Sequence, residues 1–211
     1  MLYLYRIGCG SMASFLIHMC VCNEVNKIIK KDERKILIGS IAPDFAKLIG
    51  IDRSVTHFGE YPDCDIDLFL SKYKDSMNDD FVLGYFIHLY TDYLWDELLI
   101  KKIYKDGIVT MIDGSKINYD GDICDFLYKD YDSLIEEIIE TYNMNLNFLK
   151  EDIPKIPYII DEIPMDKLDV VVKRADELVS KKVKNKLHVL DMKLIREFIS
   201  LSKNEIINKI V

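Results

Sequence analysis

The chain has 211 residues, of which 49% are hydrophobic and 30% are charged. This length suits one compact domain with a buried core, and this composition excludes a disordered, collagen-like or low-complexity chain. The 28 Lys and Arg residues are outnumbered by 36 Asp and Glu residues. The resulting net charge of -8 lacks the positive excess that sequence-independent binding to a polyanion requires. We therefore expect a single domain over residues 1–211, with no sequence-specific binding to nucleic acid.

The five cysteines are odd in number and scattered, which predicts reduced thiols in a cytoplasmic, reducing compartment rather than a disulfide framework. Cys20 and Cys22 have no second pair at zinc-site spacing, so we interpret them as residues on a helix face. The apolar stretch 9–22 contains His18 and lacks a small-residue cleavage site, so we do not expect an export signal. No apolar run reaches the about 18 residues that a membrane span requires.

The first third of the chain carries helical patterns separated by one loop. Met12 resembles a natural start, which makes residues 1–11 an N-terminal extension with little expected structural role. Apolar residues at helical spacing predict a first helix over 14–31, with Ser11 or Ser14 as its N-cap, and a second over 33–41. Proline disfavours helical geometry in the residue before it, so Pro43 must end the second helix and place Asp44 at a helix-to-turn junction.

The segment 51–65 contains Gly59 and Pro62 and is expected to be a loop that holds His57. A short helix is expected over 66–74. The next helix, over 81–104, is apolar nearly all round, which is typical of a central buried helix, and Asn78, Asp79 or Asp80 can cap it.

The second half of the chain is expected to be helical apart from one short β-hairpin. Asp113-Gly114 lies between β-prone runs and predicts a hairpin near 108–119. Helical patterns follow over 123–127, 131–149, 165–184 and 191–210. The sequence therefore predicts an all-α, single compact multi-helix domain, with a half that bears the chemistry over 12–105 and a helical half over 120–211.

Histidine and aspartate residues gather in the first half. Three of the four histidines, His18, His57 and His88, fall in the first 90 residues. His88 and Asp92 are four apart on the central helix, so both side chains project from one face and can bind the same cation. For this pair alone, a structural hydrogen bond between the two side chains is the competing interpretation.

Apolar neighbours surround each of these polar residues. Asp92 and Asp44 lie within apolar segments, and a buried carboxylate needs a partner because its desolvation is costly. Asp44 can also be an N-cap, and His18 alone can be a hydrogen-bonded core histidine. Together, the three imidazoles and two carboxylates match a mono- or dinuclear site of nitrogen and oxygen donors, which suits Zn, Mn or Fe.

Four segments in a fixed order carry a family resemblance. His18, then IGSIAPD ending at Asp44, then Thr56-His57, then GYFIHLYTD with His88 and Asp92 resemble the zinc-dependent phospholipase C family, whose all-α fold is shared with certain zinc nucleases. The match covers roughly residues 12–100.

The resemblance implies a role for each matching residue. Asp44, His57, His88 and Asp92 would surround one zinc ion, and His18 would join a second ion that Asp92 bridges. The chain departs from the family in two ways: it lacks the mature N-terminal Trp that ligates a metal, and the histidines that complete a third site are absent after Asp92. Glu60, Asp96 and Glu97 are the acids that could substitute, but we expect them to be solvated. His188 is expected to be structural or exposed.

These residues predict a metal-dependent phosphoesterase. Zinc, as one or two ions, would activate water as the nucleophile, and Asp44 would be the catalytic residue that orients or deprotonates this water. The expected partner is a small phosphate ester or a lipid headgroup. Two alternatives stay open: an HD-type nucleotide phosphohydrolase, although the chain has no His-Asp dipeptide, and a non-catalytic helical protein that retains the metal or only a hydrogen-bond network.

Overall fold

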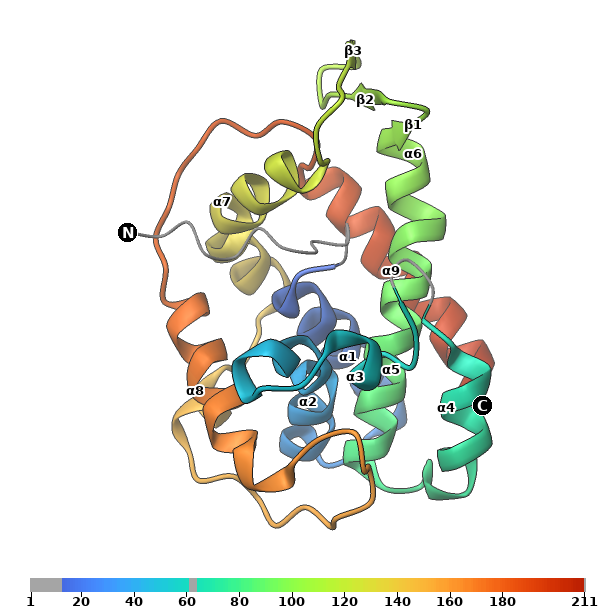
Figure 1. The fold of residues 1–211 in the computed structure, drawn as a ribbon. Coiled ribbons are helices and arrows are strands. Elements are labelled where there is room, and N and C mark those ends of the chain that lie inside the picture. Colours follow the sequence, from blue (N-terminus) through green and yellow to red (C-terminus); the bar gives the residue numbers. More distant parts are fainter. Residues whose placement is uncertain (1–12, 61–63, 211) are drawn as a thin grey trace.

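The computed structural model describes residues 13–60 and 64–210 and shows a mostly helical protein with one small sheet (Figure 1). The predicted all-α class with a short hairpin is confirmed. The expectation for residues 1–11 lies outside the described residues.

In chain order the elements are α1 (Phe15–Ile29), α2 (Glu33–Ile41), η1 (Pro43–Ile49), α3 (Arg53–Thr56), α4 (Ile66–Tyr73), η2 (Lys74–Ser76), α5 (Asp80–Trp95), η3 (Asp96–Ile100), α6 (Lys101–Ile103), β1 (Tyr104–Lys105), β2 (Ile108–Thr110), β3 (Lys116–Asn118), α7 (Cys124–Tyr142), η4 (Asn147–Lys150), η5 (Met165–Lys167), α8 (Leu168–Val179) and α9 (Met192–Ile210).

The helices of the first half begin and end close to the predicted positions because local signals define their ends. The Ser14 side chain accepts a hydrogen bond from the backbone of Ile17 and caps α1, and Asp79 caps α5 in the same way. Pro43 ends α2, and the chain continues as the 3₁₀ helix η1 with Asp44 in its first turn. The long central helix runs through α5, a π-helical segment η3 and α6, as the 81–104 prediction requires.

The structure differs from the predicted elements in three places. The expected loop 51–65 contains the short helix α3, whose N-cap Asp52 accepts a hydrogen bond from Ser54. The patterns 123–127 and 131–149 are joined in one helix, α7, which passes through the buried Asp130 and ends at Tyr142, where Asn143 adopts a left-handed conformation. The rest of the second pattern contains the separate 3₁₀ helix η4. The helix expected over 165–184 ends earlier, at Val179.

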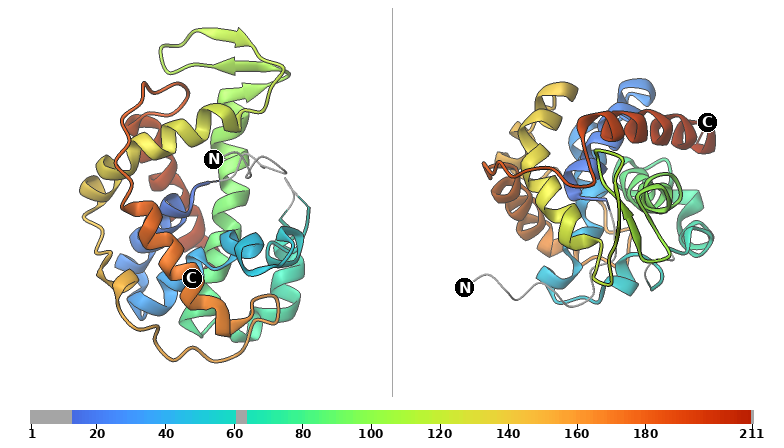
Figure 2. Two further views of the ribbon diagram at one scale, coloured as in Figure 1. Left: turned by 60° about the vertical axis from the view of Figure 1, so that its left-hand side comes forward. Right: turned by 90° about the horizontal axis from the view of Figure 1, so that it is seen from above.

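The sheet is antiparallel and has three strands in the order β1-β2-β3. The predicted hairpin is β2 and β3, in which Val109 pairs with Ile117. The strand β1, which the sequence did not predict, pairs Tyr104 with Val109. Figures 1 and 2 show this sheet at one end of the molecule, beyond the end of α6.

One continuous core joins the two halves of the chain, with buried members from Ala13 to Ile206. The central helix α5 packs against α1, α2, α4 and α9, and its most extensive contact is with α2. Figure 2 shows α7 and α8 on one side of this centre. The five metal ligands predicted from the sequence lie on α1, on α5 and in the segment between α2 and α4.

Helices α2 and α5 pack backbone against backbone at two glycines. A Cβ atom on Gly39 would clash with the carbonyl of Phe81, and one on Gly84 would clash with the carbonyl of Ile36. Glycine has no Cβ, so the two helices can approach more closely than any side chain would allow. This contact sets the distance between the end of α2 and the middle of α5.

The cysteines are in part as expected. Cys20 and Cys22 are buried on α1 and free, and Cys64 is also a free thiol. Burial raises the pKa of the Cys22 thiol to about 12, which keeps it protonated and unreactive. Cys124 is disulfide-bonded, so the prediction of reduced thiols throughout is wrong at this residue. The cytoplasmic location stays a prediction.

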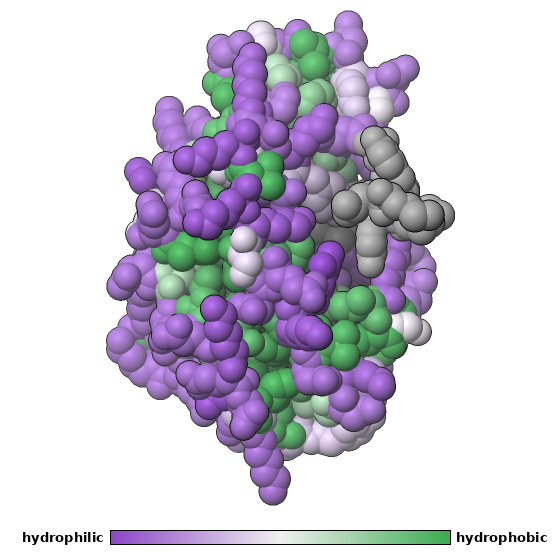
Figure 3. All heavy atoms as spheres, turned by 90° about the vertical axis from the view of Figure 1, so that its left-hand side faces the viewer, coloured by the Kyte–Doolittle hydropathy of each residue, from purple (hydrophilic) through white to green (hydrophobic). Residues whose placement is uncertain are grey.

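No helix among the described residues is long and apolar enough to cross a membrane. The face that α7 and α8 form is mainly hydrophilic, with apolar side chains gathered in patches between the charged ones (Figure 3).

The glycine contact gives a first prediction. Gly84→Ala should lower the free energy of unfolding by about 3 kcal/mol, because the helix backbones must separate to admit a methyl group. Gly50→Asn is the control, since Gly50 has open space around it and a left-handed φ of 81° that Asn tolerates. Urea unfolding measures the free energy of unfolding of both variants. An equal loss in the two would contradict the packing argument.

Candidate functional site

His88 and Asp92 lie one turn apart on α5 and face α2 and η1. His88 is fully buried, and its Nδ1 lies 2.8 Å from the backbone oxygen of Ser40, the residue after Gly39. A carbonyl oxygen can only accept, so Nδ1 carries the proton and donates to Ser40. The Nε2 atom of the neutral ring is therefore unprotonated, and its lone pair points away from α2.

His57 follows α3 and is held in the same manner. Its Nδ1 lies 3.2 Å from the backbone oxygen of Arg53 and 2.9 Å from the Thr56 hydroxyl, whose own proton goes to the carbonyl of Pro43 or Arg53. The Tyr85 hydroxyl donates to the carbonyl of Thr56 at 2.5 Å and ties the end of α3 to α5. The proton of His57 is therefore also on Nδ1, and its Nε2 is also unprotonated in the neutral ring.

The two Nε2 atoms, of His57 and His88, lie 3.1 Å apart. Two lone pairs that face each other at this distance repel, and only a proton or a cation between them makes the arrangement favourable. A tetrahedral zinc ion with Zn–N bonds of about 2.05 Å separates its ligand atoms by about 3.3 Å. The backbone carbonyls behind the rings orient them as the outer partners of metal-ligating histidines do.

Two carboxylates complete this donor set. Oδ1 of Asp44 lies 3.9 Å from His57 Nε2 and 3.7 Å from His88 Nε2. Oδ2 of Asp92 lies 3.5 Å and 3.7 Å from the same two atoms. These spacings are close to the edges of one coordination polyhedron, so four side chains from η1, α5 and the end of α3 could hold a single ion.

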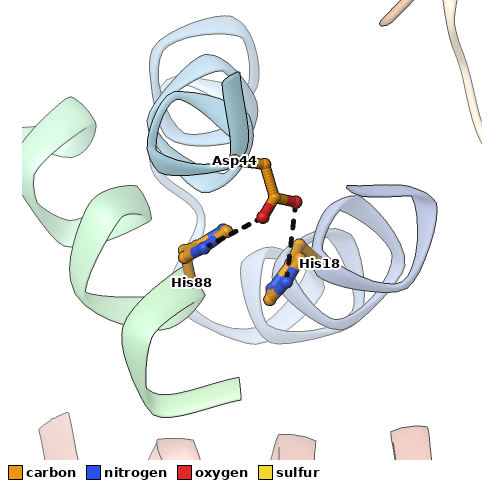
Figure 4. A group of neighbouring side chains, drawn as sticks. All are labelled: His18, Asp44 and His88. Carbon is orange, nitrogen blue, oxygen red and sulfur yellow. Dashed lines mark ion pairs between the residues drawn. The ribbon is translucent and has the colours of Figure 1, made fainter. Parts of the chain in front are cut away.

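His18 of α1 approaches the other oxygen of each carboxylate. Its Nε2 lies 3.2 Å from Asp92 Oδ1 and 3.8 Å from Asp44 Oδ2. Figure 4 shows Asp44 between His18 and His88, with one oxygen directed to each. The His18 and His88 rings stack with centroids 3.7 Å apart. Both carboxylates could thus bridge two ions, one beside His57 and His88 and one beside His18.

Three buried atoms of the cluster make no hydrogen bond of good geometry among the described residues: Nδ1 and Nε2 of His18, and Oδ1 of Asp92. Two of them, His18 Nε2 and Asp92 Oδ1, face each other as an ion pair at 3.2 Å. Buried polar groups are normally hydrogen-bonded, because an unsatisfied one costs about 1–3 kcal/mol. The ion pair compensates the charge of Asp92 Oδ1 in part, and a cation beside the two carboxylates would supply a further partner to both atoms.

Burial and mutual charge perturb every titratable member of the cluster. Burial lowers the pKa of His57 to about 3 and that of His88 well below its usual value, so both rings are neutral. Burial also opposes protonation of His18, but the charges of Asp92 and Asp44 outweigh it and raise the His18 pKa. Burial raises the pKa of Asp44 to about 7, whereas the neighbouring His18 lowers that of Asp92.

The structure thus brings together all five residues that the sequence proposed, namely His18, Asp44, His57, His88 and Asp92. Two triples within this set, His18-Asp44-His88 and His57-His88-Asp92, have ligand atoms that all lie within 4.8 Å of one another. The acids considered as substitutes for a third site are elsewhere. Asp96 and Glu97 pair with Lys101, and Glu60 is exposed.

The fourth histidine belongs to a different cluster. His188 Nδ1 lies 3.0 Å from Asp130 Oδ1, and its backbone N–H also donates to this carboxylate. The backbone N–H groups of Val189 and Leu190 donate to Asp130 Oδ2 at 2.7 Å and 2.9 Å. This fully satisfied acid anchors the chain before α9 to α7, as the structural prediction for His188 requires.

Sequence reasoning missed Arg53. Its Nη2 lies 3.3 Å from Asp92 Oδ2, and its carbonyl orients His57. The expected loop over 51–65 hid this residue, because in a loop Arg53 and His57 have no defined relation. As part of a helix they are four apart and share a face, which is the signal that could have found it.

None of three comparisons with known proteins assigns this chain to a group: no protein family, no curated protein and no solved structure matches it. The resemblance to the zinc-dependent phospholipase C family therefore stays a prediction from the motifs. The site is argued below from its own geometry.

The Asp130 cluster gives a second prediction. Asp130→Ala should lower the free energy of unfolding by about 3 kcal/mol, because it leaves several buried N–H groups without an acceptor. Asp132→Ala is the matched control on the same helix, since the Asp132 side chain is 38% exposed and pairs with Lys181 at 3.6 Å. Thermal and urea unfolding measure both. Equal stability of the two variants would show that the Asp130 bonds do not anchor the segment.

Proposed function

We propose that this protein is a metal-dependent hydrolase of phosphate esters, with zinc as one or two ions. The observation that carries the proposal is the 3.1 Å approach of the unprotonated Nε2 atoms of His57 and His88, beside the carboxylates of Asp44 and Asp92. Nitrogen and oxygen donors without thiolates suit zinc, and also manganese or iron. The motif order that resembles the zinc-dependent phospholipase C family supports the phosphate-ester substrate.

The donor sets favour a catalytic over a purely structural ion. Among the described residues, His18 and the second oxygens of the two aspartates supply three donors on their side, so an ion there would keep a position for water or substrate. The side chain of Asp44 is 13% exposed, whereas His18 and His88 are fully buried. Asp44 is the most exposed of the five donors, so a small ester would approach the cluster from the Asp44 side.

Each residue of the cluster has a separate role in the proposed reaction. An ion bound here lowers the pKa of its water and polarises a phosphoryl oxygen. Asp44, the most exposed of the five, would take the proton of the attacking water as general base when only one of its oxygens is bound to an ion. His57 and His88 keep their orientation through the carbonyls of Arg53 and Ser40. The buried rings of the cluster and the core behind them exclude bulk water from the other sides.

Metal content is the first test of this proposal. Protein purified without a histidine tag and reconstituted with zinc should contain one to two equivalents by elemental analysis. His88→Ala and Asp92→Asn should lose this metal while circular dichroism shows the fold retained. His188→Ala is the matched control, because this imidazole lies in the Asp130 cluster, and it should keep the metal. A parent protein that binds no zinc, manganese or iron would end the proposal.

Activity is the second test, on the same zinc-loaded protein. We expect hydrolysis of p-nitrophenyl phosphate, bis-p-nitrophenyl phosphate or a phospholipid headgroup, and its loss in excess chelator. Asp44→Asn should lower kcat by roughly 100-fold or more, since it removes the proton acceptor. A protein that holds zinc but hydrolyses none of these three substrates would be the non-catalytic metal-binding protein instead.

A further inference from the structure

A cavity separate from the His and Asp cluster lies where several helices meet. It has a volume of about 860 Å³, and its lining comes from the end of α1, from α4, η2 and α5, and from the end of α9. Figure 1 shows α4 and the C-terminal end of α9 on its right-hand side. Because α1 ends at Ile29 and η2 ends at Ser76, neither element continues across this space. None of the five donor residues of the cluster lines the cavity.

Most of the cavity lining is apolar. Leu83 and Phe86 of α5 belong to the buried core and are 5% and 1% exposed. Half-buried side chains that pack against the same core complete the apolar part of the lining, namely Ile29, Leu70, Met77 and Ile210. An apolar ligand would remove the remaining surface of these side chains from water, which is favourable. The volume is within the range of about 300–1,000 Å³ that is usual for small-molecule sites.

The charged side chains of the lining are all basic. They are Lys31, Lys74 and Lys209, and the remaining polar residue is Ser71, whose hydroxyl donates to the carbonyl of Leu68 at 2.7 Å. The described residues place no Asp or Glu in the lining, although the chain as a whole has 36 acidic and 28 basic residues. The cavity therefore has the opposite charge from the average of the protein, and this local charge favours an anionic group.

The backbone of Lys31 is fixed beside the cavity. Its N–H donates to Oδ1 of Asn26 at 2.8 Å, and its carbonyl accepts from Nδ2 of the same side chain at 3.3 Å. Its Nζ lies 3.5 Å from Oδ1 of Asp80, in a pair whose side chains are 35% and 21% exposed. Such a partly exposed pair is weak, and an ammonium group has three N–H donors, so Lys31 can bind a second anion as well. Among the described residues, no acid pairs with Lys74.

The combination of apolar and basic residues narrows the class of ligand. A small inorganic anion has no use for the apolar side chains, and a purely apolar ligand has no use for the three ammonium groups. A fatty acid has both an alkyl chain and a carboxylate, and a carboxylate accepts hydrogen bonds from more than one lysine. The lysine stems also add apolar contact, because their methylene groups lie along apolar surface while the ammonium reaches water.

We infer that this cavity is a binding site for a long-chain fatty acid. The alkyl chain packs against Leu83, Phe86 and the half-buried side chains around them, and the carboxylate accepts hydrogen bonds from the three lysines of the lining. No covalent step is involved. The site shares no residue with the proposed metal centre, so the inference does not depend on a bound ion.

The test titrates the 211-residue chain with octanoate, decanoate and laurate below their micellar concentrations, by isothermal titration calorimetry. Each methylene group that becomes buried should raise the affinity by about fourfold, so laurate should bind more tightly than decanoate and decanoate more tightly than octanoate. Equal affinities for the three would show that the alkyl chain is not buried and would overturn the inference. A chain that does not bind laurate would overturn it as well.

Two variants test the place of binding. Lys74→Gln should weaken laurate binding by about tenfold, since it removes a hydrogen bond to a charged group. Ser71→Phe puts an aromatic ring into the cavity from an exposed position of α4, and it should weaken laurate binding by about tenfold or more. Unchanged laurate affinity in either variant, with the fold retained by circular dichroism, would contradict the inference.

The matched control is Lys193→Gln, which removes the same charge from the first turn of α9, at the opposite end of this helix from Lys209. It should bind laurate as the parent does. Other occupants of the cavity would give different results. A dimer by light scattering without laurate binding would identify a second copy of the chain. Binding to anionic vesicles without binding of monomeric laurate would identify a membrane surface, and either result would replace the inferred fatty acid.

Discussion

The close contact of α2 and α5 at Gly39 and Gly84 is the constraint on which the site depends. Because neither glycine has a Cβ atom, the helix backbones touch, and the carbonyl of Ser40 comes within 2.8 Å of His88 Nδ1. That hydrogen bond determines which ring nitrogen of His88 is protonated and leaves Nε2 for the cluster. A wider spacing would release the imidazole and the carboxylate of Asp92 one turn further along.

A second layer of contacts holds the remaining donors. The chain from Pro43 to His57 folds back on itself, and the Thr56 hydroxyl bonds to the Pro43 carbonyl at 3.1 Å. This bond ties the segment that carries Asp44 to the segment that carries His57, and Tyr85 attaches both to α5. The donors therefore lie on a rigid frame, which reduces the cost of ordering them around an ion.

The two histidine-aspartate clusters differ in how completely their polar atoms are hydrogen-bonded. Asp130 accepts bonds from the backbone of His188, Val189 and Leu190 and from the His188 ring, so its charge is fully compensated. In the other cluster, Asp92 Oδ1 and both nitrogens of His18 make no hydrogen bond of good geometry among the described residues, and His18 and Arg53 compensate the Asp92 charge only through ion pairs at 3.2 Å and 3.3 Å. Incomplete hydrogen bonding of buried polar groups is costly, and a bound ligand would reduce this cost.

The sequence by itself determined the helical class, the ends of α1 and α2, the start of α5, and the five candidate donor residues, because these depend on local periodicity, capping and the rarity of polar residues in apolar segments. The i, i+4 spacing already placed His88 and Asp92 on one face. Only the tertiary structure decided that Nε2 of His57 and His88 meet at 3.1 Å, that Arg53 lies over Asp92, and that α7 runs unbroken through a buried Asp130. These features join residues far apart in the chain through close packing and desolvation, which act between elements and leave no trace in local spacing.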